Sequence, residues 1–261
     1  MLLAIDIGNS TIKFGIFDRK RIVQKFSVPT YPDYSPGEFL IDRLRYFDEK
    51  PLRIDIVMVS SVVPEINDAI TAAARELYNV TPTFVGPSAD FGLQVDYSPL
   101  ESLGSDRLIA AFAAAEKYGK PCIVCSFGTA TTIDVVNSAG EFLGGLIAPG
   151  MAAMADSLNF KTAKLPRVVI KNPKMVIGKS TETAIRSGVF HGHAGLVNHL
   201  ISLVAKELGE KAMVVATGGF ADMVAAGCKA IDIVDDILIL EGLRLFNERP
   251  KSAASRKIPA S

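Results

Sequence analysis

Two short segments that lie far apart in the sequence follow the same pattern. Residues 6–11 (Asp-Ile-Gly-Asn-Ser-Thr) and residues 126–132 (Ser-Phe-Gly-Thr-Ala-Thr-Thr) each come directly after an apolar run, at 2–5 and 123–125. An apolar run that stops at a glycine and hydroxyl-bearing residues predicts a buried strand ending in a tight turn. The repetition constrains the fold, because it predicts two halves of similar plan that present equivalent turns.

Turns of this composition suit a chain of phosphate groups. Glycine lets backbone N–H groups approach an anion where a Cβ would collide, and serine and threonine add hydroxyl donors. Asp6 is itself negative and contacts phosphate only through a cation, so we expect it to hold Mg²⁺ directly or through water. The pair of turns therefore predicts a nucleotide gripped from two sides.

Hydrophobic periodicity predicts an α/β fold with two duplicated halves, each a mixed β-sheet with flanking helices. Each half begins with hairpins instead of the strand-to-helix step of a Rossmann unit. We expect strands at 2–7, 11–17, 21–26, 54–63, 121–125, 132–136, 142–148 and 212–216, and helices at 37–48, 65–77, 106–117, 151–158, 181–208 (with a break) and 223–227. The predicted domains are 1–117, which includes the bridging helix 106–117, and 118–249, followed by a flexible tail at 250–261.

Composition favours a small-molecule enzyme. The 261 residues contain 28 Lys and Arg and 28 Asp and Glu, and this balance argues against nucleic acid as the main partner. No secretory start is visible, so a cytoplasmic location is expected. The uncharged stretch 187–205 contains three histidines and an asparagine and has helical spacing, which argues against a membrane span.

Cysteine and histidine pairs in this chain match metal motifs only superficially. Cys122 and Cys125 lie in a strand-like run, where residues three apart point to opposite faces, so we expect buried thiols and no redox or zinc site. His191 and His193 have no carboxylate partner nearby, and we interpret them as packing or interface residues in preference to metal ligands.

Six motifs, in order and spacing, resemble the type III pantothenate kinases of the actin, hexokinase and Hsp70 superfamily. They cover the chain to about residue 247: the segment at 6–11, Gly-Ser-Asp-Arg at 104–107, Gly-Thr-Ala-Thr-Thr-Ile-Asp at 128–134, Gly-Gly-Leu-Ile-Ala-Pro-Gly at 144–150, Ile-Gly-Lys-Ser-Thr at 177–181 and Ala-Thr-Gly-Gly at 216–219. The resemblance implies actin-like (ribonuclease H-like) halves and ATP-dependent phosphorylation of pantothenate to 4′-phosphopantothenate, the first step of coenzyme A biosynthesis. It also implies ATP with Mg²⁺, a monovalent cation (K⁺ or NH₄⁺), and a homodimer with pantothenate near the subunit interface.

By the same resemblance, Asp106 is the catalytic base. A neighbouring Arg107 and a helix N-terminus would favour its carboxylate form, although an aspartate at this position can also serve only to stabilise the first helical turn. The cofactor-binding residues implied are Asp6, Gly8, Asn9, Ser10, Thr11, Lys13, Gly128, Thr129, Thr131, Thr132, Gly218 and Gly219. The substrate-binding residues implied are Tyr97, Gly104, Ser105, Asp106, Arg107 and Thr181.

Three of these assignments have competing interpretations. The planar fork of Arg107 suits a substrate anion, carboxylate or phosphate. Tyr97 fits equally well as a half-buried loop aromatic. Gly218 and Gly219 resemble a stretch that passes close to adenosine, but paired glycines also form plain turns.

One position departs from the family pattern. Ser126 stands where the family has an aspartate that binds the monovalent cation, and Phe127 follows where a small residue is usual. A neutral hydroxyl is a weaker K⁺ ligand than a carboxylate, so we hypothesise weakened or lost K⁺ dependence, or a cation ligand from another group. Two alternatives to the kinase are a catalytically weak, ligand-binding relative acting as a regulatory accessory factor and another small-molecule kinase of the same superfold. The presence of Asp6, Asp106, Arg107, Thr129 and Asp134 together favours the enzyme.

Overall fold

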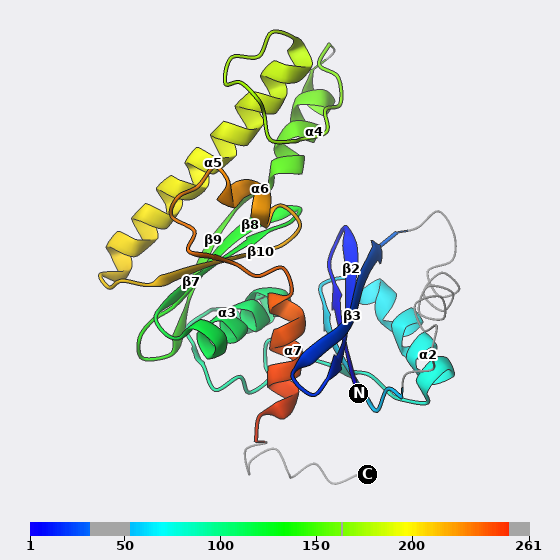
Figure 1. The fold of residues 1–261 in the computed structure, drawn as a ribbon. Coiled ribbons are helices and arrows are strands. Elements are labelled where there is room, and N and C mark those ends of the chain that lie inside the picture. Colours follow the sequence, from blue (N-terminus) through cyan, green and yellow to red (C-terminus); the bar gives the residue numbers. More distant parts are fainter. Residues whose placement is uncertain (32–52, 163, 251–261) are drawn as a thin grey trace.

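The computed structural model describes residues 1–31, 53–162 and 164–250. The helix expected at 37–48 and the tail expected from residue 251 onward lie outside these ranges. Two sheets stand side by side in Figure 1, with helices between them and on their outer faces.

The first sheet has the strand order β3-β2-β1-β4-β5. Its strands are β1 (Leu2–Ile7), β2 (Thr11–Asp18), β3 (Arg21–Pro29), β4 (Ile56–Ser61) and β5 (Thr83–Phe84). Every residue of β1 is buried, as its apolar run predicts, whereas β3 largely alternates between exposed and half-buried residues, as expected for an edge strand. A short 3-10 turn, η1 (Pro64–Ile66), leads into α2 (Asn67–Tyr78), which buries Ile70, Ala73 and Ala74 against one face of this sheet.

The second sheet repeats this plan with the strand order β11-β10-β7-β8-β9-β6. Its strands are β6 (Gln94–Val95), β7 (Cys122–Phe127), β8 (Ala130–Val136), β9 (Glu141–Pro149), β10 (Met213–Thr217) and β11 (Ile233–Val234). β7, β8 and β9 form an antiparallel meander as β1, β2 and β3 do, and β10 runs parallel to β7 as β4 does to β1. The predicted duplication and its hairpin-first topology are confirmed.

β6 was not foreseen from the sequence. This two-residue strand precedes the bridging helix but pairs in parallel with β9 of the second sheet. The chain therefore reaches the second sheet before residue 117, and the domain boundary at 117 stays a prediction. The loop after β6 contains η2 (Leu100–Ser102), which leads into the bridging helix.

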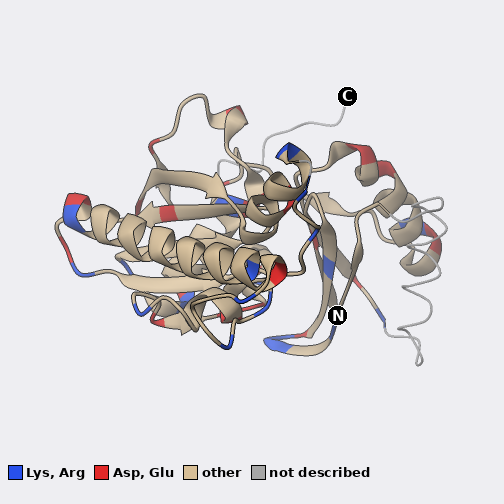
Figure 2. Ribbon diagram, turned by 90° about the horizontal axis from the view of Figure 1, so that it is seen from above, with Lys and Arg blue, Asp and Glu red and all other residues tan. Residues whose placement is uncertain are grey.

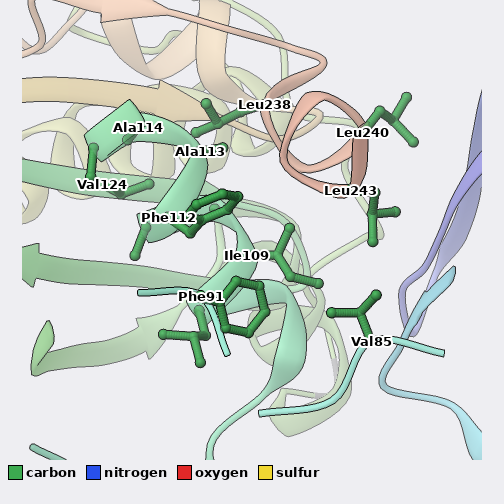
Figure 3. Packing of buried hydrophobic residues seen from close by; sticks show 14 of the residues in the cluster. Val85, Phe91, Ile109, Phe112, Ala113, Ala114, Val124, Leu238, Leu240 and Leu243 are labelled. Atoms are coloured by element: carbon green, nitrogen blue, oxygen red, sulfur yellow. The ribbon is translucent and has the colours of Figure 1, made fainter. Parts of the chain in front are cut away.

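The bridging helix α3 (Ser105–Tyr118) and the C-terminal helix α7 (Leu238–Glu248) pack together between the two sheets (Figure 1). α3 is buried on nearly all sides, as its alanine-rich sequence allows. In Figure 3, Ile109 and Phe112 of α3 meet Leu238 and Leu243 of α7 in one apolar cluster. Gly242 permits this close crossing, because a Cβ there would lie 2.7 Å from the side chain of Ile109.

Three helices cover the other face of the second sheet: α4 (Met151–Lys161), α5 (Thr181–Leu208) and α6 (Ala221–Ala225). The predicted break in 181–208 is wrong, because α5 runs unbroken from a Ser180–Thr183 capping box to a left-handed Gly209. Cys122 and Cys125 are buried in the clusters on opposite faces of β7, as predicted. Within the described ranges, no helix has both the length and the apolarity needed to cross a membrane.

Candidate active site

The two glycine and hydroxyl turns meet where the sheets face each other. Each closes a hairpin, with the N–H of Gly8 donating to the carbonyl of Thr11 at 3.1 Å and that of Gly128 to Ala130 at 3.0 Å. The hydroxyl oxygens of Ser10 and Thr129 lie 2.8 Å apart. Because both side chains are exposed, the paired turns form an accessible cluster of donors, as the repeated motif predicts.

Glycines around the second turn separate into two kinds. A Cβ at Gly150 would collide with the carbonyl oxygens of Gly128 and Thr129, and one at Gly218 would collide with the backbone of Phe127. Gly218 also has a φ of +100°, a backbone conformation that residues other than glycine rarely adopt. Gly219, by contrast, faces open space, so of the two predicted adenosine-side glycines only Gly219 borders room for a ligand.

Asp6 is a buried carboxylate close to the end of β1, with a side chain near those of Ser60 and Asp106. Burial, and next the negative charge of Asp106, raise the pKa of Asp6 from 3.8 to about 7. The charge of Lys13, which lies opposite Asp6 on β2, acts in the other direction. A second positive charge would favour the carboxylate form further, and a divalent cation supplies one.

Asp106 occupies the first turn of α3, as predicted. Burial raises its pKa, and a hydrogen bond from the backbone N–H of Arg107 opposes that effect. Its Oδ1 lies over Gly104, where an added Cβ would be only 2.5 Å away. A carboxylate with a raised pKa is a stronger proton acceptor than an exposed one, which suits a general base.

The guanidinium fork of Arg107 binds the carboxylate of Asp134 and is therefore not free for a substrate anion. Its Nε and Nη2 donate to Oδ1 of Asp134 at 3.0 and 2.5 Å, and both side chains are buried. Burial raises the pKa of Asp134, while the guanidinium opposes this shift. Only Nη1 points elsewhere, toward the Tyr97 hydroxyl at 3.4 Å. The expected role of Arg107 in anion capture is therefore corrected, because the buried Asp134 requires the charge of the fork.

Tyr97 and Thr132 complete this buried cluster. Tyr97 is half-buried, as one interpretation predicts, and packs beside Phe142 and Gly144. The hydroxyl of Thr132 donates to Oδ2 of Asp134 at 3.2 Å. Tyr97 thus contacts Arg107 of α3 directly, whereas Thr132 acts on α3 only through Asp134.

Two predicted contact residues, Thr131 and Ser105, are buried. The Thr131 side chain points to the face of β8 that α5 covers, is 1% exposed and shares a hydrogen bond with Nε2 of His193. Direct contact with a nucleotide is therefore wrong for Thr131, because strand alternation turns it into the core. Ser105 is buried as well and donates to the carbonyl of Ser61.

Thr181 is not brought together with Asp106. It is the exposed first residue of α5, and Figure 1 shows the start of this helix beside α4 and away from α3. A cavity of about 460 Å³ near this end is lined by Lys171, Lys174, Lys179 and Arg186, among others.

A second cavity, of about 410 Å³, adjoins the segment that carries Asp106. Gly104 and Ser105 of the α3 start line it together with Ser61, Asn67, Gly86 and Glu101. Its volume falls within the range of about 300–1,000 Å³ that is common for small-molecule sites. Tyr97 is not part of its lining.

The donor set fits Mg²⁺ better than it fits a monovalent cation. Protein sites for Mg²⁺ use one or two carboxylates and leave the other positions to water and phosphate oxygens, which agrees with Asp6 beside the hydroxyl turns. In the part of the chain that the structure describes, no cluster of three or more His, Cys, Asp or Glu forms a metal site. Ser126 lies between Thr132 and Thr217 on its neighbouring strands, and the nearby Asp134 carboxylate is already bound by Thr132 and Arg107.

Sequence reasoning missed the contacts of Asp134, Gly150 and His193. Asp134 and Gly150 belong to the motifs at 128–134 and 144–150, but their partners lie on α3 and on the second turn. His193 was interpreted as packing, and nothing in its local sequence indicates Thr131, 62 residues away.

Comparisons with known proteins find related sequences and a similar overall fold. A family model described as type III pantothenate kinase matches residues 2–203. A Geobacter sp. (strain M21) protein named type III pantothenate kinase is 39% identical over 254 residues, covering 96% of this chain and all of that relative. A relative of the same name from Koribacter versatilis (strain Ellin345) is 36% identical, with 98% of each chain covered. The solved activator of 2-hydroxyisocaproyl-CoA dehydratase from Clostridium difficile, with bound ADPNP, has a TM-score of 0.53 at 15% identity, covering 100% of this chain and 99% of its own.

Proposed function

The chain belongs to the type III pantothenate kinase family, and from that membership we propose how its residues perform the reaction. The chain is a phosphotransferase that uses ATP to phosphorylate pantothenate in coenzyme A biosynthesis. The observation that carries the proposed roles is the meeting of the Ser10 and Thr129 hydroxyls, with the buried Asp6 on the strand that leads into the first turn.

We propose that the paired turns hold the phosphates of ATP. The contacts would come from backbone N–H groups and hydroxyls at Gly8, Asn9, Ser10, Thr11, Gly128 and Thr129, with Lys13 adding charge and Gly219 bordering the nucleoside. The Ser10 and Thr129 hydroxyls lie within hydrogen-bond distance of each other, so one phosphate group could accept from both. Asp6 would hold Mg²⁺, which neutralises phosphate charge as the γ-phosphoryl group is transferred.

Asp106 acts in this proposal as the general base. The primary hydroxyl oxygen of pantothenate forms a bond to the γ-phosphorus while the bond from that phosphorus to the bridging oxygen breaks and ADP leaves. The hydroxyl proton passes to the Asp106 carboxylate late in the transfer. The raised pKa of Asp106 and its position beside the 410 Å³ cavity support this role.

We place pantothenate in that cavity, with Gly104 at its border. Tyr97 and Arg107 do not line this cavity, so in this proposal they act indirectly: the Arg107 fork binds Asp134 and positions α3, and Tyr97 contacts Nη1 of that fork. Arg107 therefore stands next to the proposed base because it holds the helix that carries Asp106, and its charge neutralises Asp134 instead of the substrate.

Ser126 is the basis for proposing little or no K⁺ dependence. The Ser126 hydroxyl is an uncharged and weak ligand for a monovalent cation, and the nearest carboxylate along this face, Asp134, is neutralised by Arg107. The chain would therefore rely on Mg²⁺ and hydrogen-bond donors near ATP.

A homodimer is proposed from the apolar surface of the second half. Several large apolar side chains on β9, α4 and the segment before α5 are exposed, among them Ile147, Phe160, Val169, Val176 and Ile177. Burying such residues between two copies would lower the free energy, and it would allow Thr181 to serve the pocket of the partner. A single-chain mass in ultracentrifugation at micromolar concentration would contradict the dimer.

Because ATP is the phosphate donor, we place the enzyme in the cytoplasm.

The direct test is formation of 4′-phosphopantothenate from ATP and pantothenate with Mg²⁺, comparing the parent chain with Asp106→Asn. Turnover that drops by about 10²-fold or more in a folded variant supports the base assignment. Absence of turnover in a folded parent chain would favour the regulatory relative instead.

A further inference from the structure

His193 and Thr131 form a buried hydrogen bond that joins α5 to β8. His193 Nε2 lies 2.8 Å from Thr131 Oγ1, and each residue is 1% exposed. Thr131 pairs with Phe127 across the hairpin, and residues 128–130 form the turn between them. The bond therefore fixes the base of the second hydroxyl turn from the side opposite to the open cluster.

The surroundings of His193 are largely apolar. Its helix neighbours Val189, Phe190 and Val197 belong to one buried apolar cluster, and Figure 2 shows no charged residue along the middle of α5. The His193 ring also meets the edge of the Phe127 ring, with centroids 6.0 Å apart. A polar ring in such a place costs free energy unless it is hydrogen-bonded, so the bond to Thr131 is what accommodates it.

The second ring nitrogen indicates the direction of this bond. Among the residues that the structure describes, Nδ1 of His193 is buried without a hydrogen-bond partner. Burial lowers the pKa of His193, which favours the neutral ring with a single N–H. A buried N–H without an acceptor is rarer than an unpaired acceptor, which assigns the proton to Nε2 and makes His193 the donor.

We infer that His193 is a positioning residue for the phosphate-binding turn. Through Thr131 it fixes the end of β8, and thereby the N–H groups of 128–130 and the hydroxyl of Thr129. The inference rests on the proposed nucleotide role of this turn. It assigns His193 no contact with substrate and no part in proton transfer.

The kinetic test compares His193→Leu, which removes the donor, with His193→Gln, whose amide can still donate. The matched control is His199→Leu, an exposed position on the same helix. We expect the KM for ATP to rise roughly fivefold in His193→Leu, with the KM for pantothenate unchanged and most of the loss restored in His193→Gln. If His193 only fills space, the Leu variant keeps its KM for ATP and the Gln variant is the worse of the two, which would overturn the inference.

A second measurement does not depend on turnover. The N–H groups of Gly128 and Gly150 donate to the carbonyls of Ala130 and Thr129 at 3.0 and 3.2 Å, so their hydrogen exchange reports the order of the turn. We expect faster exchange at both amides in His193→Leu without ATP, and the same change in Thr131→Val, which removes the hydroxyl from the other side.

These readouts separate the two proposals. An inactive parent chain whose turn loosens in both variants would contradict the proposed function and leave the positioning role supported. If the hydrogen exchange of the turn and the KM for ATP are unchanged in folded His193→Leu or in folded Thr131→Val, the positioning role is wrong.

Discussion

The hydroxyl oxygens of Ser10 and Thr129 lie 2.8 Å apart, although 119 residues separate them in the sequence. Each belongs to a hairpin turn of a different sheet, so the pair marks the point where the two halves approach each other. A ligand that needs donors from both halves has its natural place here.

Replacing Thr129 by valine removes one of these donors. We expect the KM for ATP to rise about tenfold or more, because a hydrogen bond to a charged phosphate oxygen is lost. Steady-state kinetics of Thr129→Val beside Thr81→Val, at an exposed position after α2, tests this. An unchanged KM for ATP would remove Thr129 from the proposed site.

Substituting Gly104 by alanine displaces the proposed base. The new Cβ would lie 2.5 Å from Oδ1 of Asp106, and that carboxylate can move away more easily than the backbone. We expect kcat to fall at least tenfold while the chain stays folded, since positioning of the base contributes strongly to the rate. The control is Gly86→Ala in the same cavity, where a Cβ has open space. Equal kcat values in the two variants would contradict the position given to Asp106.

Removing the carboxylate that neutralises Arg107 destabilises the fold. Asp134→Asn leaves a guanidinium buried without its counter-charge, and we expect the free energy of unfolding to drop by about 3–5 kcal/mol. Urea denaturation of Asp134→Asn and Asp156→Asn measures this, because Asp156 pairs with Arg167 on the surface. A loss at Asp134 no larger than the one at Asp156, about 1 kcal/mol or less, would show that the buried pair does not stabilise α3.

The pKa of Asp6 makes the metal-free protein less stable as the pH rises. Because this pKa is about 7 in the folded chain against 3.8 in the reference state, the folded chain binds the proton more tightly across that interval. The proton on Asp6 therefore contributes its full stabilisation below about pH 4, and this contribution is lost as the pH rises through about 7. The free energy of unfolding falls over this interval by up to about 1.4 kcal/mol per pH unit.

The unfolding free energies of the parent chain and Asp6→Asn, measured from pH 4 to pH 8 without divalent cations, reveal this contribution as a difference. We expect the variant to gain stability relative to the parent as the pH rises. Asp68→Asn on the exposed face of α2 serves as the control. A difference that does not vary with pH would contradict the raised pKa.

The serine at position 126 leads us to predict a weak response to monovalent cations. We expect the parent turnover to change less than about twofold when Na⁺ is exchanged for K⁺ or NH₄⁺, since a hydroxyl is a weak ligand for these ions. Ser126→Asp is expected to introduce activation by K⁺, and Ser126→Ala should behave like the parent chain. A many-fold increase in the turnover of the parent chain on adding K⁺ would overturn the hypothesis.

The sequence predicted the elements better than their partners. The buried strands, the hairpin-first order and the turns at 8–11 and 128–130 follow from local composition, because alternation and glycine content act within a few residues. The break expected in α5 was wrong. Its exposed glycines weaken the helix locally, but the capping box and the burial of Val189, Phe190 and Val197 outweigh that cost.

By itself, then, the sequence determined a duplicated α/β fold and the presence of two glycine and hydroxyl turns, while the phosphate-binding role of these turns and of Asp6 and Asp106 stays a prediction. Only the tertiary structure decided that Arg107 pairs with Asp134, that Thr131 faces His193, and that Ser10 meets Thr129. The physical reason is that such contacts depend on the rotation of each helix and the face of each strand. Both are set by packing between segments 27 to 119 residues apart, which local patterns do not encode.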